Sequence, residues 1–216
     1  MTGAIASTRV TAIRHGETAW NVQSRLQGHL DSPLTGRGRA QAARLADALR
    51  GEGLDAVISS DSGRALETAS AFASALGLSV LTDAGLRERA FGDLEGLTYG
   101  ENDTQWPDLA VQWRARAPDF APPGGESLRS FQARCLASAD RLARTHAGLS
   151  IALVTHGGVL DCLYRAAVGV DLSAARTWQL NNAAINRLLH TDAGFTLVGW
   201  NDSQHLDALG LDEGMA

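Results

Sequence analysis

The sequence contains no lysine, so its 19 basic side chains are all arginines. This absence excludes a P-loop, whose lysine binds nucleotide phosphates, and Schiff-base chemistry on a lysine amine. Any permanently charged side chain that binds an anion must therefore be a guanidinium, which contacts phosphate oxygens through two parallel hydrogen bonds. Candidate anion sites in this chain are thus built from arginine or histidine.

Cysteines and long apolar segments are also scarce. Cys135 and Cys162 have no CxxC or CxxH partner, so we interpret them as small buried residues rather than as a disulfide or metal ligands. No apolar run approaches the roughly 20 residues that span a bilayer, and the first eight residues do not resemble a signal peptide. The net charge of −5 argues against a nucleic-acid or anionic-membrane surface. We therefore expect a cytoplasmic protein with no nucleic-acid or membrane partner.

The 216 residues are enough for one well-buried domain, and the alternation of strand-like and helical segments predicts an α/β fold with a mostly parallel sheet. We expect residues 9–206 to form this domain, residues 1–8 to be disordered and residues 207–216 to form a loose acidic tail. An antiparallel hairpin around Asp192-Ala193-Gly194 should close one edge of the sheet. The predicted strands cover residues 10–13, 54–59, 78–81, 149–155, 183–190 and 196–200, and the predicted helices cover residues 38–50, 63–76, 128–145 and 159–168.

Two buried strands each deliver a histidine to the same end of the predicted sheet. The stretch Val10–Asn21, reading VTAIRHGETAWN, begins as a strand and turns at Gly16, directly after Arg14 and His15. The most apolar strand, residues 149–155, runs directly into His156. Because open α/β sheets bind ligands at the carboxyl ends of their parallel strands, the pair indicates a site rather than two buried core histidines.

Other polar residues are expected to join this site. Arg64 lies in the first turn of a helix, where its charge opposes the helix dipole, and this mismatch favours anion binding. The preceding Ser60, Asp61 and Ser62 can cap that helix. Glu88 lies between two arginines, which leaves a surface ion pair and a site carboxylate both open.

Three segments are expected around these residues. Thr18 and Asn21 follow His15 within reach of the same spot. Gln27-Gly28 offers either a side-chain amide and a bare backbone N–H to a ligand or simple turn chemistry. Residues 99–116 form a helical excursion that covers the site, with Trp106 and Trp113 interpreted as packing anchors.

Such a cluster suits phosphoryl transfer. The reaction needs positive charge on the phosphoryl oxygens, a nucleophile and a proton for the leaving group. Arginines can supply the charge, a neutral imidazole can attack phosphorus to give a phosphohistidine, and a carboxylic acid can donate the proton and then activate water. The sequence has neither an HExxH motif nor clustered aspartates, so we predict chemistry without a metal.

Four blocks of sequence resemble the histidine phosphatase superfamily, the group that is similar to phosphoglycerate mutases. They occur in family order and are RHGETxxN at Arg14–Asn21, SSDSGRALETA around Arg64, RERAFGDLEG around Glu88 and VTHGG around His156. The resemblance implies a three-layer α/β/α sandwich, with His15 as nucleophile and Glu88 as proton donor. It also implies that His156, Arg14 and Arg64 hold the phosphoryl group, and that Asn21, Gln27, Gly28 and the N–H of Gly157 line the pocket.

Within this family the sequence predicts a phosphatase that needs no cofactor and acts on a small phosphorylated metabolite. Mutases of the family carry a lysine near the position of Thr98, a paired arginine after a tryptophan and a long insertion before the second histidine. This chain has no lysine, reads Trp113-Arg114-Ala115-Arg116 and lacks the insertion. The ERxxG block at Glu88 keeps a mutase dependent on 2,3-bisphosphoglycerate as the alternative, and a non-catalytic module that binds a phosphorylated partner as the third. The oligomeric state stays open between a monomer and a homodimer.

Overall fold

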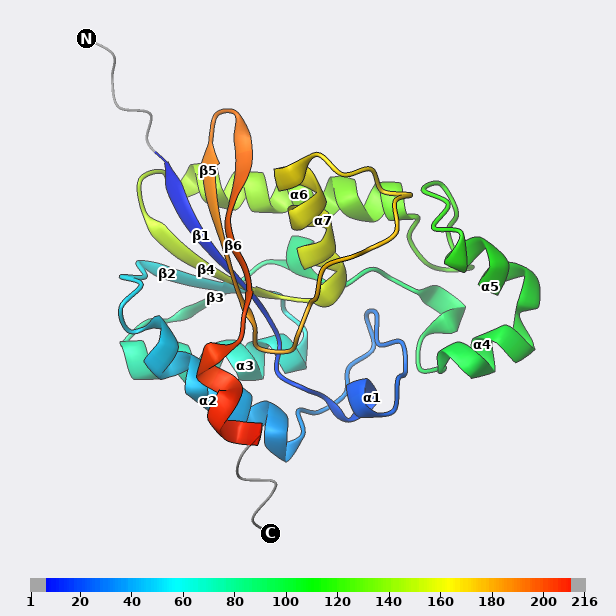
Figure 1. Ribbon diagram of the computed structural model, residues 1–216, viewed down its shortest axis with the longest axis horizontal. Coiled ribbons are helices and arrows are strands. Elements are labelled where there is room, and N and C mark those ends of the chain that lie inside the picture. The colour runs from blue at the N-terminus through cyan, green and yellow to red at the C-terminus, as the bar shows by residue number, and fades with distance from the viewer. Residues whose placement is uncertain (1–6, 211–216) are drawn as a thin grey trace.

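A six-stranded sheet organises residues 7–210, the part of the chain that the computed structural model describes (Figure 1). Its strand order is β3-β2-β4-β1-β5-β6. The first four of these pair in parallel and the last two are antiparallel. This confirms an α/β fold with a mostly parallel sheet and an antiparallel hairpin at the edge. The strands are β1 (Thr8–Arg14), β2 (Ala56–Ser59), β3 (Val80–Thr82), β4 (Ser150–Thr155), β5 (Ile185–Thr191) and β6 (Gly194–Asp202).

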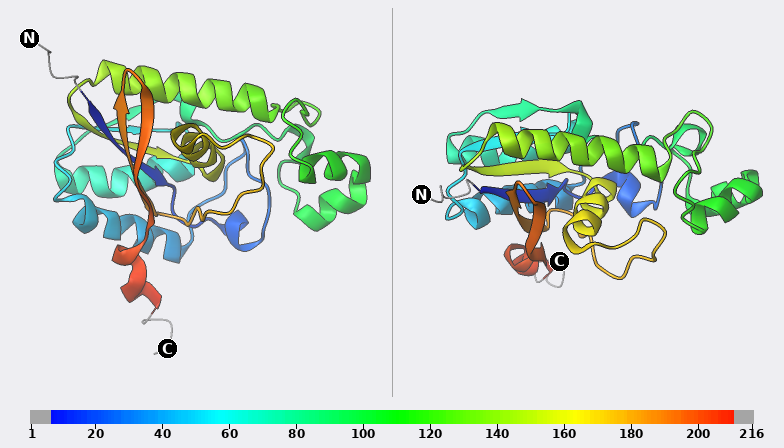
Figure 2. Two further views of the ribbon diagram at one scale, coloured as in Figure 1. Left: turned by 45° about the horizontal axis from the view of Figure 1, so that its top comes forward. Right: turned by 90° about the horizontal axis from the view of Figure 1, so that it is seen from above.

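Helices cover both faces of the sheet and give three layers (Figures 1 and 2). Helices α6 (Leu128–Thr145) and α7 (Gly157–Val168) pack on one face, and α2 (Gly36–Leu49) and α3 (Gly63–Ala73) pack on the other. Successive residues of a strand point to opposite faces, so each buried strand supplies both cores. In β4, Leu153 packs with the α6–α7 core and Val154 with the α2–α3 core.

Polar residues fix the helix boundaries. The Thr35 hydroxyl accepts a hydrogen bond from Gly38 N at the start of α2, and the Ser127 hydroxyl accepts one from Ser130 N at the start of α6. Helix α7 ends at Gly169, whose φ of 72° lies in the left-handed region that glycine adopts without strain. These helices begin and end within two residues of the boundaries that the sequence predicts.

The predicted ends of the domain need correction where the structure describes them. Thr8 was expected to be disordered, but it begins β1, is buried and donates its hydroxyl to Ala143 O at 2.8 Å. Residues 207–210 were expected in the loose tail, but they lie in the 3-10 helix η4 (Gln204–Gly210). Leu206 of this helix packs against the α2–α3 core. The rest of the predicted termini, residues 1–6 and 211–216, lies outside the described residues.

The segments outside the three layers gather where the parallel strands end. These are α1 (Ala19–Val22), α4 (Tyr99–Gln105), α5 (Pro107–Arg114) and the segment 169–184 between α7 and β5 (Figure 1). Helices α4 and α5 form the helical excursion expected at residues 99–116, with a break at Trp106 before Pro107. Among residues 7–210, no helix combines the length and apolarity that a membrane span requires.

Candidate active site

The pairing of β1 with β4 brings the two histidines together. Arg14 is opposite Thr155 in the parallel register, and His15 N donates to Thr155 O at 2.9 Å. His15 and His156 therefore follow as neighbours, with ring centroids 5.2 Å apart and ring planes at 60°. His15 is 3% exposed and His156 is fully buried.

Contacts at the end of β1 define the chemical state of the His15 ring. Nδ1 lies 2.8 Å from Gly16 O, and because a carbonyl can only accept, Nδ1 carries the hydrogen and Nε2 keeps a free lone pair. Burial, with the charges of Arg64 and Arg14, lowers the pKa of His15 well below its ordinary 6.5. The ring is therefore a neutral imidazole at neutral pH, which is the nucleophilic form.

Hydrogen bonds from segment 169–184, which the sequence did not predict, hold the turn after β1. Asn182 Nδ2 donates to His15 O at 2.9 Å and to Asn21 Oδ1 at 3.2 Å, and Ala183 N donates to Arg14 O at 3.0 Å. Ala183 has a φ of 56°, a strained conformation for a residue other than glycine. A pair of asparagines at the entry to a hairpin was the available signal, but nothing local shows which strand end they contact.

His156 is oriented by hydroxyls that were expected to cap α3. Its Nε2 lies 2.9 Å from Ser60 Oγ and 3.2 Å from Ser62 Oγ, whereas Ser62, at the cap position of α3, makes no side-chain cap bond. The capping prediction for these serines was wrong because the imidazole is the partner of both hydroxyls. Burial lowers the pKa of His156 well below 6.5, and its buried Nδ1 has no partner among the described residues. A buried polar atom without a partner is costly, so Nδ1 is available to a ligand.

Two arginines frame the histidines, and each has a buried Nε without a hydrogen-bond partner in the described chain. Arg14 donates through Nη1 to Leu180 O. Arg64, which is 1% exposed, donates to Leu30 O and Asp31 Oδ1 at 2.8 Å and to Gly28 O at 2.9 Å. Neither Nε has a partner within the described part of the chain, although both are buried. Arg64 is thus an anion-site candidate that also holds the loop at residues 28–31.

Glu88 lies at the N-terminus of α7 and makes no ion pair with the arginines on either side. Its Oε1 accepts from Arg89 N at 2.8 Å and its Oε2 accepts from Gly158 N at 3.0 Å, while Arg87 pairs with Asp61. A Cβ at position 158 would lie 2.1 Å from Glu88 Oε1, so glycine there allows the carboxylate to approach the helix. Of the two alternatives that the sequence left open, the structure shows a carboxylate directed into the site.

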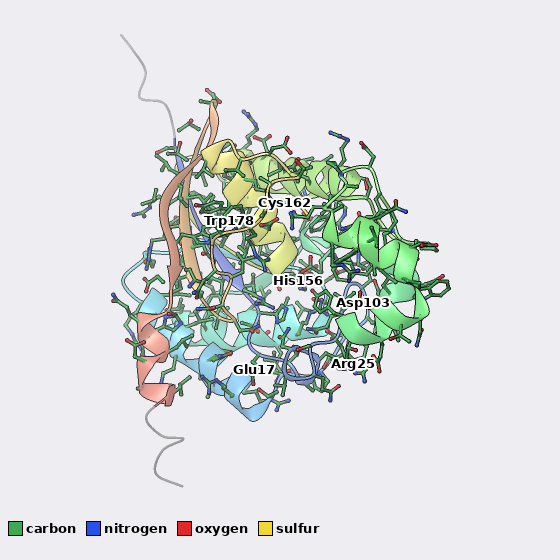
Figure 3. The ribbon with its side chains drawn as sticks, turned by 45° about the vertical axis from the view of Figure 1, so that its right-hand side comes forward. Glu17, Arg25, Asp103, His156, Cys162 and Trp178 are labelled. Carbon is green, nitrogen blue, oxygen red and sulfur yellow. The ribbon has the colours of Figure 1, made fainter. Side chains whose placement is uncertain are left out.

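These side chains surround a cavity of about 760 Å³. Trp178 and Arg25 also line it, and in Figure 3 their labels lie on opposite sides of His156, which packs behind His15. The cavity also reaches Tyr99 and Trp113, which belong to the excursion expected to cover the site, and Trp20 and Arg176, which the sequence did not assign to it. The sequence-predicted residues that line the cavity are Arg14, His15, Asn21, Gln27, Gly28, Arg64, Glu88 and Gly157.

Thr18 was expected to bind the ligand, and this needs correction. It is fully buried, its hydroxyl accepts from Asn21 N at 3.1 Å, and its backbone N donates to Asn21 Oδ1 at 3.1 Å. Thr18 is therefore the N-cap of α1 and positions Asn21, because a threonine three residues before an amide side chain forms a reciprocal capping box.

Within the described part of the chain, the cysteines do not form a metal site. Cys135 and Cys162 are free and buried, as expected from their spacing. Among residues 7–210, no group of three His, Cys, Asp or Glu side chains is placed to hold a metal ion.

The two buried histidines predict a dependence of stability on pH. Their pKa values are lowered in the folded state, so between that low pKa and about 6.5 the unfolded chain binds protons that the folded chain does not. The contribution of the two neutral histidines to the free energy of unfolding should therefore be complete above pH 6.5. It should fall as the pH drops below 6.5, by up to about 1.4 kcal/mol per pH unit for each histidine. Urea unfolding between pH 4.5 and 7.5 measures this slope. The variant H15N/H156N should flatten it, and an unchanged slope in that variant would assign the effect to other groups.

Comparison with known proteins places this geometry in a family. The sequence pattern of the histidine phosphatase superfamily (branch 1) matches residues 10–203, most of the chain. The chain belongs to this superfamily. Phosphoglycerate mutase-like protein 4 of Arabidopsis thaliana is 40% identical over 207 residues, covering 94% of this chain and 88% of the relative.

Solved structures of the superfamily share the fold over nearly the whole chain. YhfR of Bacillus stearothermophilus superposes with a TM-score of 0.87 at 34% identity, covering 93% of this chain and 100% of YhfR. The mycobacterial glucosyl-3-phosphoglycerate phosphatase Rv2419c, in complex with VO3, superposes with a TM-score of 0.80 at 33% identity, covering 90% of this chain and 99% of that chain. The superfamily contains both phosphatases and mutase-like proteins, so this chain is an enzyme of one of these two kinds.

In this superfamily member, Arg89 joins the excursion α4–α5 to the rest of the cavity wall. Its guanidinium stacks 4.8 Å from the ring of Trp113 on α5 and donates to Glu126 O at 2.7 Å and Phe120 O at 3.1 Å. Burial lowers the pKa of Arg89 to about 10, so it stays charged at neutral pH. Trp113 also packs edge-on against Phe91 at 5.2 Å, as expected of a packing anchor, and it lines the cavity as well.

Proposed function

We propose that this protein is a phosphomonoesterase that hydrolyses a small phosphorylated metabolite through a phosphohistidine on His15. The observation that carries the proposal is the state of the His15 ring, a neutral imidazole whose Nδ1 is bound to Gly16 O and whose Nε2 is free at the cavity. In the first step the Nε2 lone pair attacks phosphorus and the bond from phosphorus to the alcohol oxygen breaks.

The charge of the transferring group is held by donors that lack partners in the free protein. Arg14 Nε, Arg64 Nε and His156 Nδ1 are buried polar atoms next to His15. Both guanidinium charges act on both imidazoles, which places them close to where the phosphoryl group would be held. Donors that are already in place need little reorganisation in the transition state. We expect their electrostatic stabilisation to be the largest contribution to the rate.

Glu88 would transfer the proton in both steps. In its acid form it donates to the departing alkoxide, so that the alcohol leaves neutral. In the second step the carboxylate takes a proton from water, the water oxygen attacks phosphorus and the bond from phosphorus to Nε2 breaks. Inorganic phosphate and free His15 are the products, and Glu88 is again an acid.

Residues at the cavity favour hydrolysis of a phosphoester over isomerisation of a phosphoglycerate. A mutase must retain a bisphosphate intermediate, but this chain has no lysine at any position. Arg114, which follows Trp113, pairs with Asp103 on the exposed surface of α4 and α5. Arg116 lines the cavity, but its guanidinium binds Asp161 Oδ2 at 3.0 Å and Leu172 O at 3.1 Å. The mutase alternative rests on the ERxxG block and on the similarity to a mutase-like plant protein.

Covalent trapping tests the proposal. After reaction with a phosphoester labelled at phosphorus, the protein should carry a label that is stable to base and labile to acid, and peptide mapping should place it on His15. A panel of phosphoesters should show phosphate release. With 3-phosphoglycerate as substrate, release of phosphate should be faster than isomerisation to 2-phosphoglycerate, with or without 2,3-bisphosphoglycerate. Faster isomerisation than phosphate release would establish the mutase alternative. Absence of both label and turnover, with phosphate ligands still bound, would support the binding module.

A further inference from the structure

Arg176 is a cavity arginine whose charge is not used by the protein itself. It lies in segment 169–184, lines the cavity and is exposed, and it makes no hydrogen bond or ion pair with any residue from 7 to 210. Other arginines on the cavity have partners, since Arg25 pairs with Glu101, Arg64 with Asp31 and Arg116 with Asp161. A free guanidinium with its five donors available is suited to bind a carboxylate or phosphate.

The chain on both sides of Arg176 is held by contacts with other elements. Ala174 O accepts from Arg165 Nη2 at 2.9 Å. Trp178 stacks on Tyr164 with ring centroids 4.1 Å apart, and Leu180 O accepts from Arg14 Nη1. The chain is thus held two residues before Arg176 by a backbone carbonyl and two residues after it by a stacked tryptophan ring.

The charge of Arg176 reaches both the phosphoryl end of the cavity and its outer wall. It adds to the burial that lowers the pKa of Arg14, and it opposes the burial that raises the pKa of the Tyr99 hydroxyl. Tyr99 is the first residue of α4, lines the cavity and has a hydroxyl without a hydrogen-bond partner in the described chain. An O–H donor and a guanidinium from two separate elements therefore face the same space.

The acidic residues of the cavity do not neutralise this charge. Asp161 Oδ2 accepts from Arg116 at 3.0 Å and from Arg165 at 2.9 Å, so this carboxylate is already paired with two arginines, while its buried Oδ1 has no partner in the described chain. Glu88 is held by the backbone N–H groups of Arg89 and Gly158. The excess positive charge at Arg176 remains available to a ligand.

We propose that Arg176 and Tyr99 form a second anion subsite, so that preferred substrates carry a carboxylate or a second phosphate in addition to the phosphoryl group that is removed. This rests on the proposed function insofar as His15 defines where that phosphoryl group is held. The subsite selects substrates by their second charge, because a bidentate, charge-assisted contact forms only with ligands that have one.

Binding of phosphonates, which cannot be hydrolysed, tests the subsite in the intact protein. Calorimetry would compare alkyl phosphonates with carboxyalkyl phosphonates of matched length, from 3-phosphonopropionate to 6-phosphonohexanoate, and with propane-1,3-bisphosphonate. At least one ligand with two anionic groups should bind about tenfold more tightly than its alkyl counterpart. Preference for the carboxylate or for the bisphosphonate identifies which second group the subsite takes.

Two variants and a control decide the assignment. Arg176→Gln should abolish the tenfold advantage and change the affinity of the alkyl phosphonate less than twofold, and Tyr99→Phe should reduce the advantage about threefold. The matched control is Arg114→Gln, an exposed arginine off the cavity, which should keep the full advantage. No advantage in the wild-type protein, or an advantage that survives Arg176→Gln, overturns the subsite. Failure of the proposed function would instead appear as absent phosphohistidine and turnover, which phosphonate binding does not report.

Discussion

Replacing His15 with alanine is expected to lower kcat by at least about 10⁴-fold and to abolish the acid-labile label, because removal of a covalent nucleophile leaves only binding and charge stabilisation. The His15 ring supplies a neutral Nε2 at the cavity, and no other described imidazole has that position: the His156 ring lies behind it with its Nε2 bound to serine hydroxyls. Phosphate release from a phosphoester that the wild-type protein hydrolyses measures the loss.

His190 provides the matched control for this variant. It is also a buried histidine, 4% exposed, but it lies on β5 and pairs with Asp140 away from the cavity. His190→Ala should cost stability, because it leaves a cavity and removes the hydrogen bond to Asp140, whose ion pair with Arg144 remains, and it should keep kcat within about twofold. Retention of more than a tenth of the wild-type kcat by folded His15→Ala would rule out the phosphohistidine route.

Replacing Glu88 with glutamine is expected to lower kcat on alkyl phosphates by about 10²- to 10⁴-fold, because an amide can neither donate nor take up the proton. The amide is nearly the same shape and its oxygen can still accept from Gly158 N, so the fold should be preserved, although the NH2 group loses the bond that Oε1 accepts from Arg89 N. With 4-nitrophenyl phosphate the leaving group needs no proton, so phosphorylation should remain fast while hydrolysis of phosphohistidine slows. Rapid-quench experiments should then show a burst of nitrophenol followed by slow turnover. Equal losses on both substrates without a burst would contradict the role of Glu88 as acid.

Gly158→Ala disturbs the same carboxylate without changing its chemistry. The added Cβ would lie 2.1 Å from Glu88 Oε1 and 3.0 Å from Phe131 Cε1, so the flexible end of Glu88 must move. A misplaced catalytic group is expected to cost about 10²-fold in kcat. Gly100→Ala on α4 is the control, because a Cβ there has no neighbour within 4 Å.

The sequence predicts the sheet well because its signals are local. Residues 149–155 are mostly apolar, as expected of a central strand buried on both faces, and β4 is buried at every position. The approach of His15 to His156 follows from the rule that parallel strands end at one edge, which needs no knowledge of side-chain partners. The hairpin differs from the prediction only in where its strands begin and end. As predicted, it closes one edge of the sheet, with β5 paired to β1 and β6 paired to β5.

The partners of the polar side chains could not be read from local sequence. Thr18 and Asn21 look like ligand-binding residues next to His15, but their spacing also fits a capping box, and the structure has the box. Ser60 and Ser62 look like a cap, but a histidine from β4 takes their hydroxyls. In each case two interactions were compatible with the same residue types, and only the tertiary fold selects one.

Segment 169–184 shows the other limit of sequence reasoning. It has neither helical nor strand periodicity, so no pattern indicates which of its side chains face inward. Asn182 reaches His15 and Arg176 reaches the cavity because the segment is tied to α7 and to Arg14 by contacts between residues distant in sequence. Arg64 was easier to identify, because its unfavourable place in a helix first turn is itself a signal.

The adjacency of β1 and β4 links catalysis to the order of folding. His15 follows the first strand and His156 follows the fourth, so most of the chain must be enclosed as a loop before the two rings meet. Closing such a loop carries an entropic cost that local hairpins and helix pairs do not pay. Species that have formed only their local structure therefore lack the paired imidazoles, and activity returns only when the central strands dock.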